Sequence, residues 1–469
     1  MDLERLVTAL GPQEVRGGAP LDVTDLAYDT RSVTPGALFF CVPGERADGH
    51  DFADDAVERG AVALVVERPL DLRVPQLVVR SSRTAMAPAA DEFFGRPTDD
   101  LVLAGVTGTA GKTTTTFLLW SIFEVAGMKP GLIGTIESRV GGESRPAVRT
   151  TPEAIDLQRT FRAMLDAGDR SCAMEATSHG SELGRLDRVR FKALAFTNLS
   201  QDHLDFHDSM ETYFEAKRRL FVEHDPAPAA AVNIGDPWGL RLADELRRLD
   251  RAPLLTYGLS PGADLVAHPA LEHSRLAGSF NVENVLAAAA VCRLLGVPDE
   301  AVVAGVTALS GVPGRFETVD EGQQFTVIVD YAHKPGALEA VLRTARKLTS
   351  KRLVCVVGAG GDRDRGKRPI MGRVASELSD LTIVTSDNPR TEEPLAIIEE
   401  IMGGVVGDAE VEVNRREAIA KAIRLARDGD VVVIAGRGAE QYQDVGREKL
   451  PFDDREVARE ALRKVRAPA

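Results

Sequence analysis

Short, continuous apolar runs alternate with longer segments of helical character over most of this chain. Runs at 101–106, 171–174, 193–196 and 229–232 have the length and composition of strands that are buried on both faces. The stretches between them are compatible with helices, and segment 278–295 is a strong helix candidate with polar residues at its N-terminal end. Strands and helices in alternation predict a parallel, doubly wound sheet.

The same alternation is found before and after this region. Near the N-terminus, apolar runs at 38–42, 62–66 and 76–79 accompany a helical stretch at 52–59. Toward the C-terminus, predicted strands at 326–329, 353–357, 381–385 and 431–435 are each followed by a Gly-, Pro- or Asp-rich loop and a helical segment. The sequence therefore predicts an α/β protein of three domains: a small α/β domain at 1–98, a central parallel-sheet domain at 99–311 and a Rossmann-like domain at 312–469.

Composition narrows the possible environments and partners. A length of 469 residues suits three domains, and a formal net charge of −14 disfavours broad binding to nucleic acid or anionic membranes. The four cysteines are scattered among apolar neighbours, as in a reduced intracellular protein. The N-terminus has no signal-peptide core, and no apolar run approaches the roughly 18 residues of a membrane span. These features predict a cytoplasmic protein without nucleic-acid or membrane partners.

The strongest chemical signal lies at 101–127. The first strand ends in a glycine-rich turn, GVTGTAGKTTTT, which opens an apolar helix that stops at Gly127. Glycines allow backbone N–H groups to approach phosphates, Lys112 can reach the terminal phosphates, and a threonine hydroxyl can hold Mg²⁺. The strict GxxxxGK[ST] spacing is not met, because Val106 occupies the place of its first glycine. The pattern predicts an ATP-type site of P-loop character, and the alternative is a Gly-rich turn without a ligand.

Two candidate metal ligands follow strands of the central domain. Glu175 comes after the strand at 171–174, and His203 lies in the acidic loop after the strand at 193–196. Functional groups gather at the C-terminal ends of parallel strands, so both side chains could face the phosphate turn and hold a metal ion. The alternative for His203 is a loop histidine paired with Asp202 or Asp205.

Other polar residues remain ambiguous from spacing alone. Lys217 lies on a predicted helix and is by itself no different from an ordinary surface lysine. Asn281 and Asn284 share one helix face, where their amides could read adenine or cap the helix.

Loops of the third predicted sheet bring charges of both signs toward one crevice. They carry Arg363, Asp387, Arg390 and Glu440, a set that suits a zwitterionic ligand. The alternative is a solvated network of surface ion pairs. Segment 356–364 resembles a dinucleotide turn but lacks the third glycine of GxGxxG, which disfavours NAD binding.

Taken together, the motifs resemble those of the Mur ligase family along nearly the whole chain. They occur in the family's order: GTAGKTT, TTP at 150–152, MEATSH, TNLSQDHLDFH, the Lys217 segment, GRFE at 314–317, DYAH at 330–333, GGDRD and DNPR. The resemblance implies an ATP- and Mg²⁺-dependent ligase of peptidoglycan precursor synthesis. It would add an amino acid to UDP-N-acetylmuramoyl-L-alanyl-D-glutamate through an acyl phosphate, with a UDP-binding first domain, an ATPase second domain and a third domain for the amino acid. We expect a monomer.

The resemblance also implies roles for individual residues. The nucleotide would be bound by Thr107, Gly108, Thr109, Gly111, Lys112, Thr113, Thr114, Asn281, Asn284, Arg315 and Asp330. The UDP-linked substrate would contact Tyr28, Thr30, Thr150, Thr151, Thr177 and Arg185. The incoming amino acid would contact Arg363, Asp387, Asn388, Pro389, Arg390, Gly436 and Glu440.

Four side chains would be catalytic by the same resemblance: Lys112, Glu175, His203 and Lys217. Thr113 and Glu175 would hold one Mg²⁺, and His203 with a carbamylated Lys217 would hold a second. Carbamylation would convert a cation that repels Mg²⁺ into an oxygen ligand.

The chain departs from the family pattern at Ala110, Arg149, Thr177, Leu183, Arg437 and Ala439. The DNPR pattern and the far-end charges favour meso-diaminopimelate as the amino acid. The alternatives are an L-lysine-adding or other ligase of the family, or a homologue that binds the UDP precursor with little catalysis. The segment DTRSVTPGALFF argues against a folylpolyglutamate synthetase.

Overall fold

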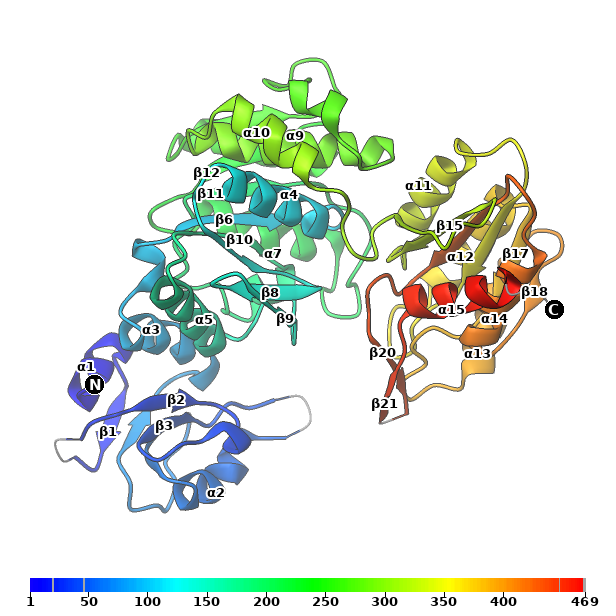
Figure 1. Ribbon diagram of the computed structural model, residues 1–469. Coiled ribbons are helices and arrows are strands. Elements are labelled where there is room, and N and C mark those ends of the chain that lie inside the picture. The colour runs from blue at the N-terminus through cyan, green and yellow to red at the C-terminus, as the bar shows by residue number, and fades with distance from the viewer. Residues whose placement is uncertain (19–20, 45–46, 447, 467–469) are drawn as a thin grey trace.

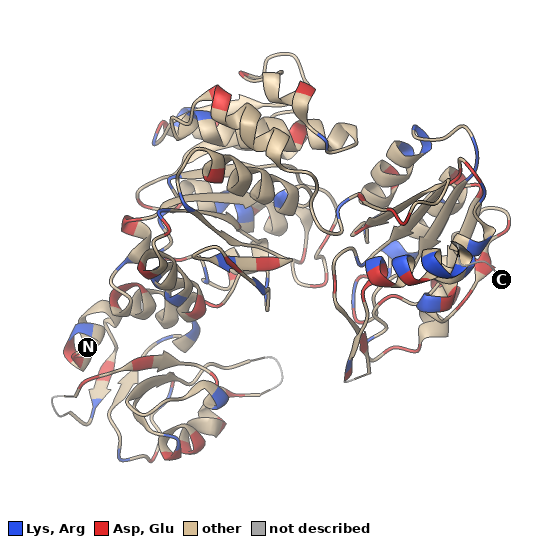
Figure 2. Ribbon diagram, viewed as in Figure 1, with Lys and Arg blue, Asp and Glu red and all other residues tan. Residues whose placement is uncertain are grey.

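The computed structural model describes residues 1–18, 21–44, 47–446 and 448–466, and it has three α/β bodies in chain order (Figure 1). Each body is built around its own sheet. Acidic and basic side chains are interspersed over all three (Figure 2). Within the described part of the chain, no helix is long and apolar enough to cross a membrane.

The N-terminal body has a five-stranded sheet in the order β1-β5-β4-β3-β2, in which only β1 is antiparallel to its neighbour. Its elements are α1 (Leu3–Leu10), β1 (Glu14–Arg16), β2 (Asp25–Ala27), β3 (Ala37–Phe40), α2 (Ala53–Glu58), β4 (Ala61–Val66), β5 (Gln76–Val78) and α3 (Ser82–Phe93). Ala154 and Ile155, which belong to the next body, pack into its core and join the two.

The central body has an eight-stranded sheet in the order β13-β12-β11-β6-β10-β7-β8-β9. Its strands are β6 (Val102–Thr107), β7 (Pro130–Ile133), β8 (Glu137–Val140), β9 (Glu143–Pro146), β10 (Ser171–Glu175), β11 (Ala193–Phe196), β12 (Ala229–Asn233) and β13 (Leu254–Tyr257). Its helices are α4 (Lys112–Val125), α5 (Ala154–Ala167), α6 (Ser178–Glu182), α7 (Met210–Val222), α8 (Pro237–Leu249), α9 (Ser279–Leu294) and α10 (Asp299–Ala308). One apolar core contains residues of α4, α9 and α10, and a second contains residues of α5, α7 and α8. The sheet is therefore covered on both faces.

The C-terminal body has a six-stranded sheet in the order β14-β15-β19-β16-β17-β18, parallel except for β14. Its strands are β14 (Glu317–Val319), β15 (Thr326–Asp330), β16 (Leu353–Val357), β17 (Leu381–Val384), β18 (Glu410–Val411), β19 (Val431–Ala435), β20 (Tyr442–Val445) and β21 (Glu448–Pro451). Its helices are α11 (Pro335–Arg346), α12 (Lys367–Leu378), α13 (Pro394–Met402), α14 (Arg415–Leu425) and α15 (Asp454–Arg466).

The buried strands that the sequence predicts are present with nearly the predicted bounds. One prediction needs correction: after β19 the chain forms the antiparallel hairpin β20–β21 before α15, so a helix does not follow its loop directly. Strands β1 and β9 were not predicted, because their residues are all exposed and form no apolar run, and the short buried strand β7, which begins with a proline, was not predicted either. We propose domain boundaries at 98/99 and 311/312, because each of the three large sheets begins and ends within one of these ranges.

Candidate active site

The glycine-rich turn between β6 and α4 forms a loop that we call the phosphate loop, residues 107–112. Gly108 and Gly111 have φ angles of +145° and +85°, which side-chain-bearing residues rarely adopt. A Cβ at Gly108 would also overlap the Thr197 hydroxyl. Gly111 caps α4 without a side-chain hydrogen bond to the first turn of the helix. Backbone N–H groups at this helix start are therefore available to an anion.

Three lysines converge on the carbonyl groups of the phosphate loop. Lys112 Nζ donates to Gly108 O at 2.9 Å and to Thr109 O at 3.0 Å. Lys217 Nζ donates to Gly108 O at 3.2 Å, and Lys334 Nζ donates to Thr109 O at 3.4 Å. Burial, together with the nearby Lys334, lowers the pKa of Lys112 to about 8. Lys112 and Lys334 thus bring positive charge to the place where phosphates would bind.

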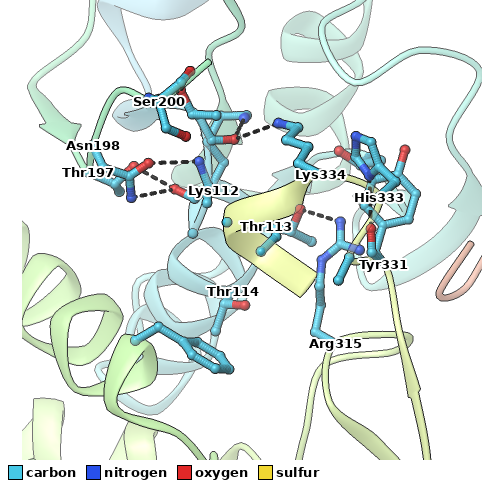
Figure 3. A pocket seen from close by; sticks show the side chains of 18 of the residues that line it. Lys112, Thr113, Thr114, Thr197, Asn198, Ser200, Arg315, Tyr331, His333 and Lys334 are labelled. Carbon is cyan, nitrogen blue, oxygen red and sulfur yellow. Dashed lines mark hydrogen bonds between the residues drawn. The ribbon is translucent and has the colours of Figure 1, made fainter. Parts of the chain in front are cut away.

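A cavity of about 970 Å³ opens above this loop between the central and C-terminal domains. Residues 109–114 line its central-domain side. Arg315, Asp330 and Lys334 line the opposite side, and Figure 3 shows Arg315 reaching toward Thr113. Residues of both domains that are predicted to bind the nucleotide therefore line the same cavity.

Arg315 and Asp330 are held by well-defined contacts. Arg315 Nη2 donates to Thr113 Oγ1 at 3.1 Å, and its guanidinium lies 4.2 Å from the centre of the Tyr331 ring. Asp330 accepts hydrogen bonds from the backbone N–H groups of Phe316, at 2.6 Å, and Ala332, at 2.7 Å. Its carboxylate thus orders the segment that carries Arg315.

Asn281 and Asn284 line the cavity, but their amides already have partners. Asn284 Nδ2 donates to Asn281 Oδ1 at 2.9 Å, and Asn281 Nδ2 donates to Ala277 O at 2.7 Å. Neither side chain caps α9, whose N-cap is Gly278. The pair lies directly against the phosphate loop, because a Cβ at Gly111 would overlap Asn284 Oδ1.

Glu175 and His203 both line the cavity, as the sequence predicts for residues at the C-terminal ends of parallel strands, and their strands β10 and β11 lie on either side of β6. Glu175 is buried and accepts hydrogen bonds from Thr135 N at 2.7 Å and Thr135 Oγ1 at 3.1 Å. His203 Nε2 lies 2.9 Å from Asp202 Oδ2, which is the pairing considered as the alternative. The same carboxylate oxygen lies 2.5 Å from Lys334 Nζ.

The donor set fits a magnesium ion that is bound together with phosphates. Among the described residues, no group of three or more His, Cys, Asp and Glu side chains could hold a metal by itself. Mg²⁺ in nucleotide sites needs only one or two protein oxygens, with phosphates and water as its other ligands. The Thr113 hydroxyl and the Glu175 carboxylate line one cavity and can supply those oxygens.

Lys217 is buried behind the phosphate loop rather than on an open surface. Its Nζ lies 4.5 Å from the centre of the Tyr213 ring, and the residue is 1% exposed. Burial and the neighbouring Lys112 hold the pKa of Lys217 well below its usual value, which favours the neutral amine. This environment separates Lys217 from its neighbour Arg218, which pairs with Glu215 and Glu245 near the surface.

The residues predicted for the UDP-linked substrate fall into two groups. Thr150, Thr151, Thr177 and Arg185 line the cavity. Tyr28 lies in the N-terminal domain, where its hydroxyl donates to Asp156 Oδ2 at 2.5 Å. Thr30 begins a short 3₁₀ helix, Thr30–Ser32, of the same domain. Tyr28 and Thr30 are thus on a different body from the other four.

The predicted amino-acid site is only partly assembled as expected. Asn388 Nδ2 donates to Glu440 Oε2 at 2.8 Å. Asp387 lies close enough to Glu440 to raise the pKa of that carboxyl, in addition to the larger effect of burial. Gly436, with a φ angle of +125°, leaves the space that Asp387 Oδ2 occupies.

The two arginines of this predicted site differ in their placement. Arg390 Nη1 donates to Gly361 O at 2.5 Å, and Pro389 lies against Gly361. Arg363 points elsewhere: its Nη1 lies 4.0 Å from Asp205 of the central domain, and its side chain is 53% exposed. The inclusion of Arg363 in the four-charge cluster therefore stays a prediction.

Several residues of the site were missed from the sequence. Lys334, His333 and Lys367 line the cavity from the C-terminal domain, and His179 lines it from α6. Arg437, noted only as a departure, is fully buried and donates to Asn388 Oδ1 at 2.5 Å. Lys334 directly precedes Pro335, the first residue of α11. A lysine between a predicted strand and the following helix was the feature of the sequence that could have identified it.

Comparison with known proteins agrees with this geometry. Residues 22–94 match the Mur ligase family catalytic domain, residues 106–292 the Mur ligase middle domain, and residues 314–438 the Mur ligase glutamate ligase domain. The chain belongs to the Mur ligase family. The α/β fold and the ATP- and Mg²⁺-dependent, amide-forming ligase activity that the sequence predicts are thereby confirmed.

Relatives over the whole length have a more specific name, UDP-N-acetylmuramoyl-L-alanyl-D-glutamate–2,6-diaminopimelate ligase. One from Geobacillus thermodenitrificans is 46% identical and covers 99% of this chain and 100% of its own length. One from Geobacter metallireducens is 44% identical, with 99% of each chain covered. A solved structure of a ligase with the same name has a TM-score of 0.65 and 30% identity, and covers 96% of each chain.

Proposed function

We propose that this chain adds meso-diaminopimelate to UDP-N-acetylmuramoyl-L-alanyl-D-glutamate at the expense of ATP, in peptidoglycan precursor synthesis. The observation that carries this proposal is the near-full-length similarity to ligases of that name, at 46% and 44% identity. The geometry supports it, because a phosphate loop and side chains from two domains line one cavity.

The proposed reaction has two steps. A side-chain carboxylate oxygen of D-glutamate takes the γ-phosphoryl group of ATP, which gives an acyl phosphate and ADP. The amine of diaminopimelate then attacks the acyl carbon, loses a proton and expels inorganic phosphate, leaving an amide bond. Both steps develop negative charge on phosphate oxygens, and preorganised cations stabilise such charge.

The chain supplies these cations from both sides of the cavity. Lys112 would contact the β- and γ-phosphates from the phosphate loop. Lys334 and Arg315 approach the same loop from the C-terminal domain, through Thr109 O and Thr113 Oγ1. Binding of ATP would therefore draw on both domains at once.

Thr113 and Glu175 would hold one Mg²⁺, and His203 with a carbamylated Lys217 would hold a second. When bound, Mg²⁺ screens the charge of the phosphates and orients them for in-line transfer. To bind the metal, His203 would have to give up its contact with Asp202. Lys334 can then neutralise the Asp202 carboxylate through its own ion pair with it.

We predict that Lys217 is carbamylated in the active enzyme. A buried, neutral amine is the form that adds carbon dioxide, releasing one proton as the carbamate forms, and the surroundings of Lys217 favour that form. Mass spectrometry under native conditions and a crystal structure with nucleotide and Mg²⁺ would detect the added group. Lys217→Ala should lose activity and partly regain it with short-chain carboxylic acids, whereas Lys192→Ala, at an exposed lysine, should not. A free Lys217 amine in the metal- and nucleotide-bound enzyme would contradict this prediction.

Phosphate release across a panel of amino acids tests the function as a whole. We expect release only when the UDP-linked dipeptide and ATP are both present, with meso-diaminopimelate as the preferred amine. If L-lysine is the only amino acid that supports phosphate release, the chain is the lysine-adding version. Binding of the UDP-linked dipeptide without phosphate release would indicate a homologue with little catalysis.

We also propose that the enzyme is a cytoplasmic monomer. ATP and UDP-linked precursors are cytoplasmic compounds, and one chain supplies both sides of the cavity. Sedimentation analysis of the active protein would test the monomeric state.

A further inference from the structure

The hairpin β20–β21 lies against the segment 387–390, which we call the DNPR segment. Figure 1 shows this hairpin extending away from the sheet of the C-terminal domain. Arg390 N donates to Asp444 O at 3.0 Å, and Gly446 N donates to Arg390 O at 2.7 Å. Arg390 and Val445 therefore pair as residues of parallel strands do. The hairpin thus extends beyond its own two strands to hold the DNPR segment.

These contacts hold Arg390 in an unusual backbone conformation. Its φ angle is +51°, in the left-handed region that side-chain-bearing residues rarely adopt. Such a conformation persists only where the surrounding structure imposes it. Because the hairpin binds both the N–H and the C=O of Arg390, it sets the direction in which this side chain leaves the backbone. At the other end of the segment, Gln443 Nε2 donates to Asp387 O.

Arg437 fastens the base of the hairpin to the same segment. Its side chain is fully buried, and its Nη1 donates to Asn388 Oδ1 at 2.5 Å. Its Nη2 donates to the carbonyl groups of Tyr442, the first residue of β20, and Phe452, which directly follows β21. One guanidinium group therefore joins the DNPR segment to both ends of the hairpin.

The contact with Arg437 also fixes the orientation of the Asn388 amide. Asn388 Oδ1 accepts from Arg437 and from Asp444 N at 2.9 Å, and both of these groups can only donate. The Nδ2 atom of Asn388 is therefore the one that faces Glu440 Oε2, at 2.8 Å. A reversed amide would place oxygen against oxygen at Glu440. Arg437 thus decides which group Asn388 offers to Glu440.

Two buried arginines allow three carboxylates to lie close together here. Arg415 donates to both oxygens of Asp454, at 2.8 and 2.6 Å, and Asp454 Oδ1 lies 4.0 Å from Arg437 Nε. Asp387 lies 4.0 Å from Arg415, and Glu440 lies 3.8 Å from Arg437. Two guanidinium groups and three carboxylates leave one negative charge, which suits the ammonium group of a ligand.

We propose that Arg437 is a positioning residue for the incoming amino acid, and that it acts through Asn388 and the hairpin β20–β21. Asn388 would direct the Glu440 carboxylate, and the hairpin would direct the Arg390 guanidinium. This inference rests on the proposed function for the identity of the amino acid. It adds Arg437 and the hairpin to the residues predicted to touch the ligand, although neither needs to touch it.

Amino-acid kinetics of the full chain test this role. Arg437→Lys keeps the charge but loses the planar fork that joins Asn388 to the hairpin. We expect it to raise the KM for meso-diaminopimelate by about tenfold and to leave the KM for ATP and for the UDP-linked dipeptide within about twofold of wild type. Gln443→Leu, which loses the hydrogen bond to Asp387 O, should raise the same KM by a smaller factor. A purely structural role would lower the Tm and the active fraction without changing the KM of one substrate alone.

A control on the same hairpin and a double variant separate positioning from general stability. Lys449 is an exposed residue of β21 whose ammonium lies 4.0 Å from the centre of the Tyr442 ring, so Lys449→Ala should leave every KM unchanged. Asn388→Ala removes the amide through which Arg437 acts. Adding Arg437→Lys to it should therefore raise the KM for diaminopimelate by a smaller factor than in the wild type. Equal factors in the two backgrounds would overturn the route through Asn388.

The outcome for Arg437 is separable from the outcome for the proposed function. If both Arg437→Lys and Gln443→Leu are active and keep the KM for diaminopimelate within about twofold of wild type, the positioning role is overturned alone. A wild-type chain that uses L-lysine in preference contradicts the proposed function, and the same comparison with L-lysine still decides the role of Arg437. If the chain ligates no amino acid, calorimetry with meso-diaminopimelate supplies a Kd in place of the KM.

Discussion

Lys112→Ala should lower kcat by about 10³-fold or more while the fold is preserved, because it removes a cation that stabilises the transferring phosphoryl group. The ammonium group of Lys112 lies at two adjacent carbonyls of the phosphate loop, 2.9 Å from Gly108 O and 3.0 Å from Thr109 O. The two other lysines at the loop already have contacts of their own. Lys217 reaches the loop from behind, and Lys334 is engaged by Asp202.

The measurement is phosphate release at saturating ATP, with circular dichroism and thermal unfolding to verify the fold. Lys192→Ala is the matched control, since Lys192 is an exposed lysine of the same domain that contributes a backbone hydrogen bond to Leu103. Its kcat should stay near the wild-type value. A Lys112→Ala enzyme that turns over at the wild-type rate would refute the assignment of the phosphate loop.

The wild-type enzyme should prefer meso-diaminopimelate over L-lysine by roughly 10⁴-fold in kcat/KM, because a site that hydrogen-bonds a polar group of its substrate rejects a ligand that lacks this group. Diaminopimelate carries a carboxylate and an ammonium at its far end, whereas lysine carries only an ammonium. Asp387 and Glu440 are two carboxyl groups held close together, and no described residue donates a hydrogen bond to Asp387 Oδ2. They can receive the ammonium of the ligand.

Arg390 is the partner that we assign to the far-end carboxylate. Its side chain is 26% exposed, and its guanidinium lies beside Gly361 and Asp444. With lysine bound, this guanidinium would lose water without gaining a carboxylate.

Arg390→Ala should raise the KM for diaminopimelate by about tenfold to a hundredfold and leave the KM for ATP nearly unchanged. Arg343→Ala is a suitable control, because Arg343 is an exposed arginine of the same domain that pairs with Glu339 one helical turn away. Comparable kcat/KM values for the two amino acids in the wild-type enzyme would refute the assignment.

The sequence by itself determined most of the buried framework and the phosphate loop, while the short buried strand β7 was not predicted. Strands such as β11 and β16 agree with their predicted bounds because a strand buried on both faces must be a continuous apolar run, which is visible locally. The phosphate loop was predictable for the same kind of reason, since its glycines and Lys112 are adjacent in the chain. Exposed strands such as β9 carry no such pattern and were missed.

Only the tertiary structure decided which distant side chains share a site. Lys334 and Thr109 are separated by 225 positions, yet they are in contact because the C-terminal domain faces the phosphate loop. Arg83 meets Glu153 because α3 packs against α5, and Arg363 is turned toward Asp205 by a contact of the same long-range kind. Local sequence patterns determine the secondary structure around each residue. The packing of the domains determines which charged side chains lie next to that residue.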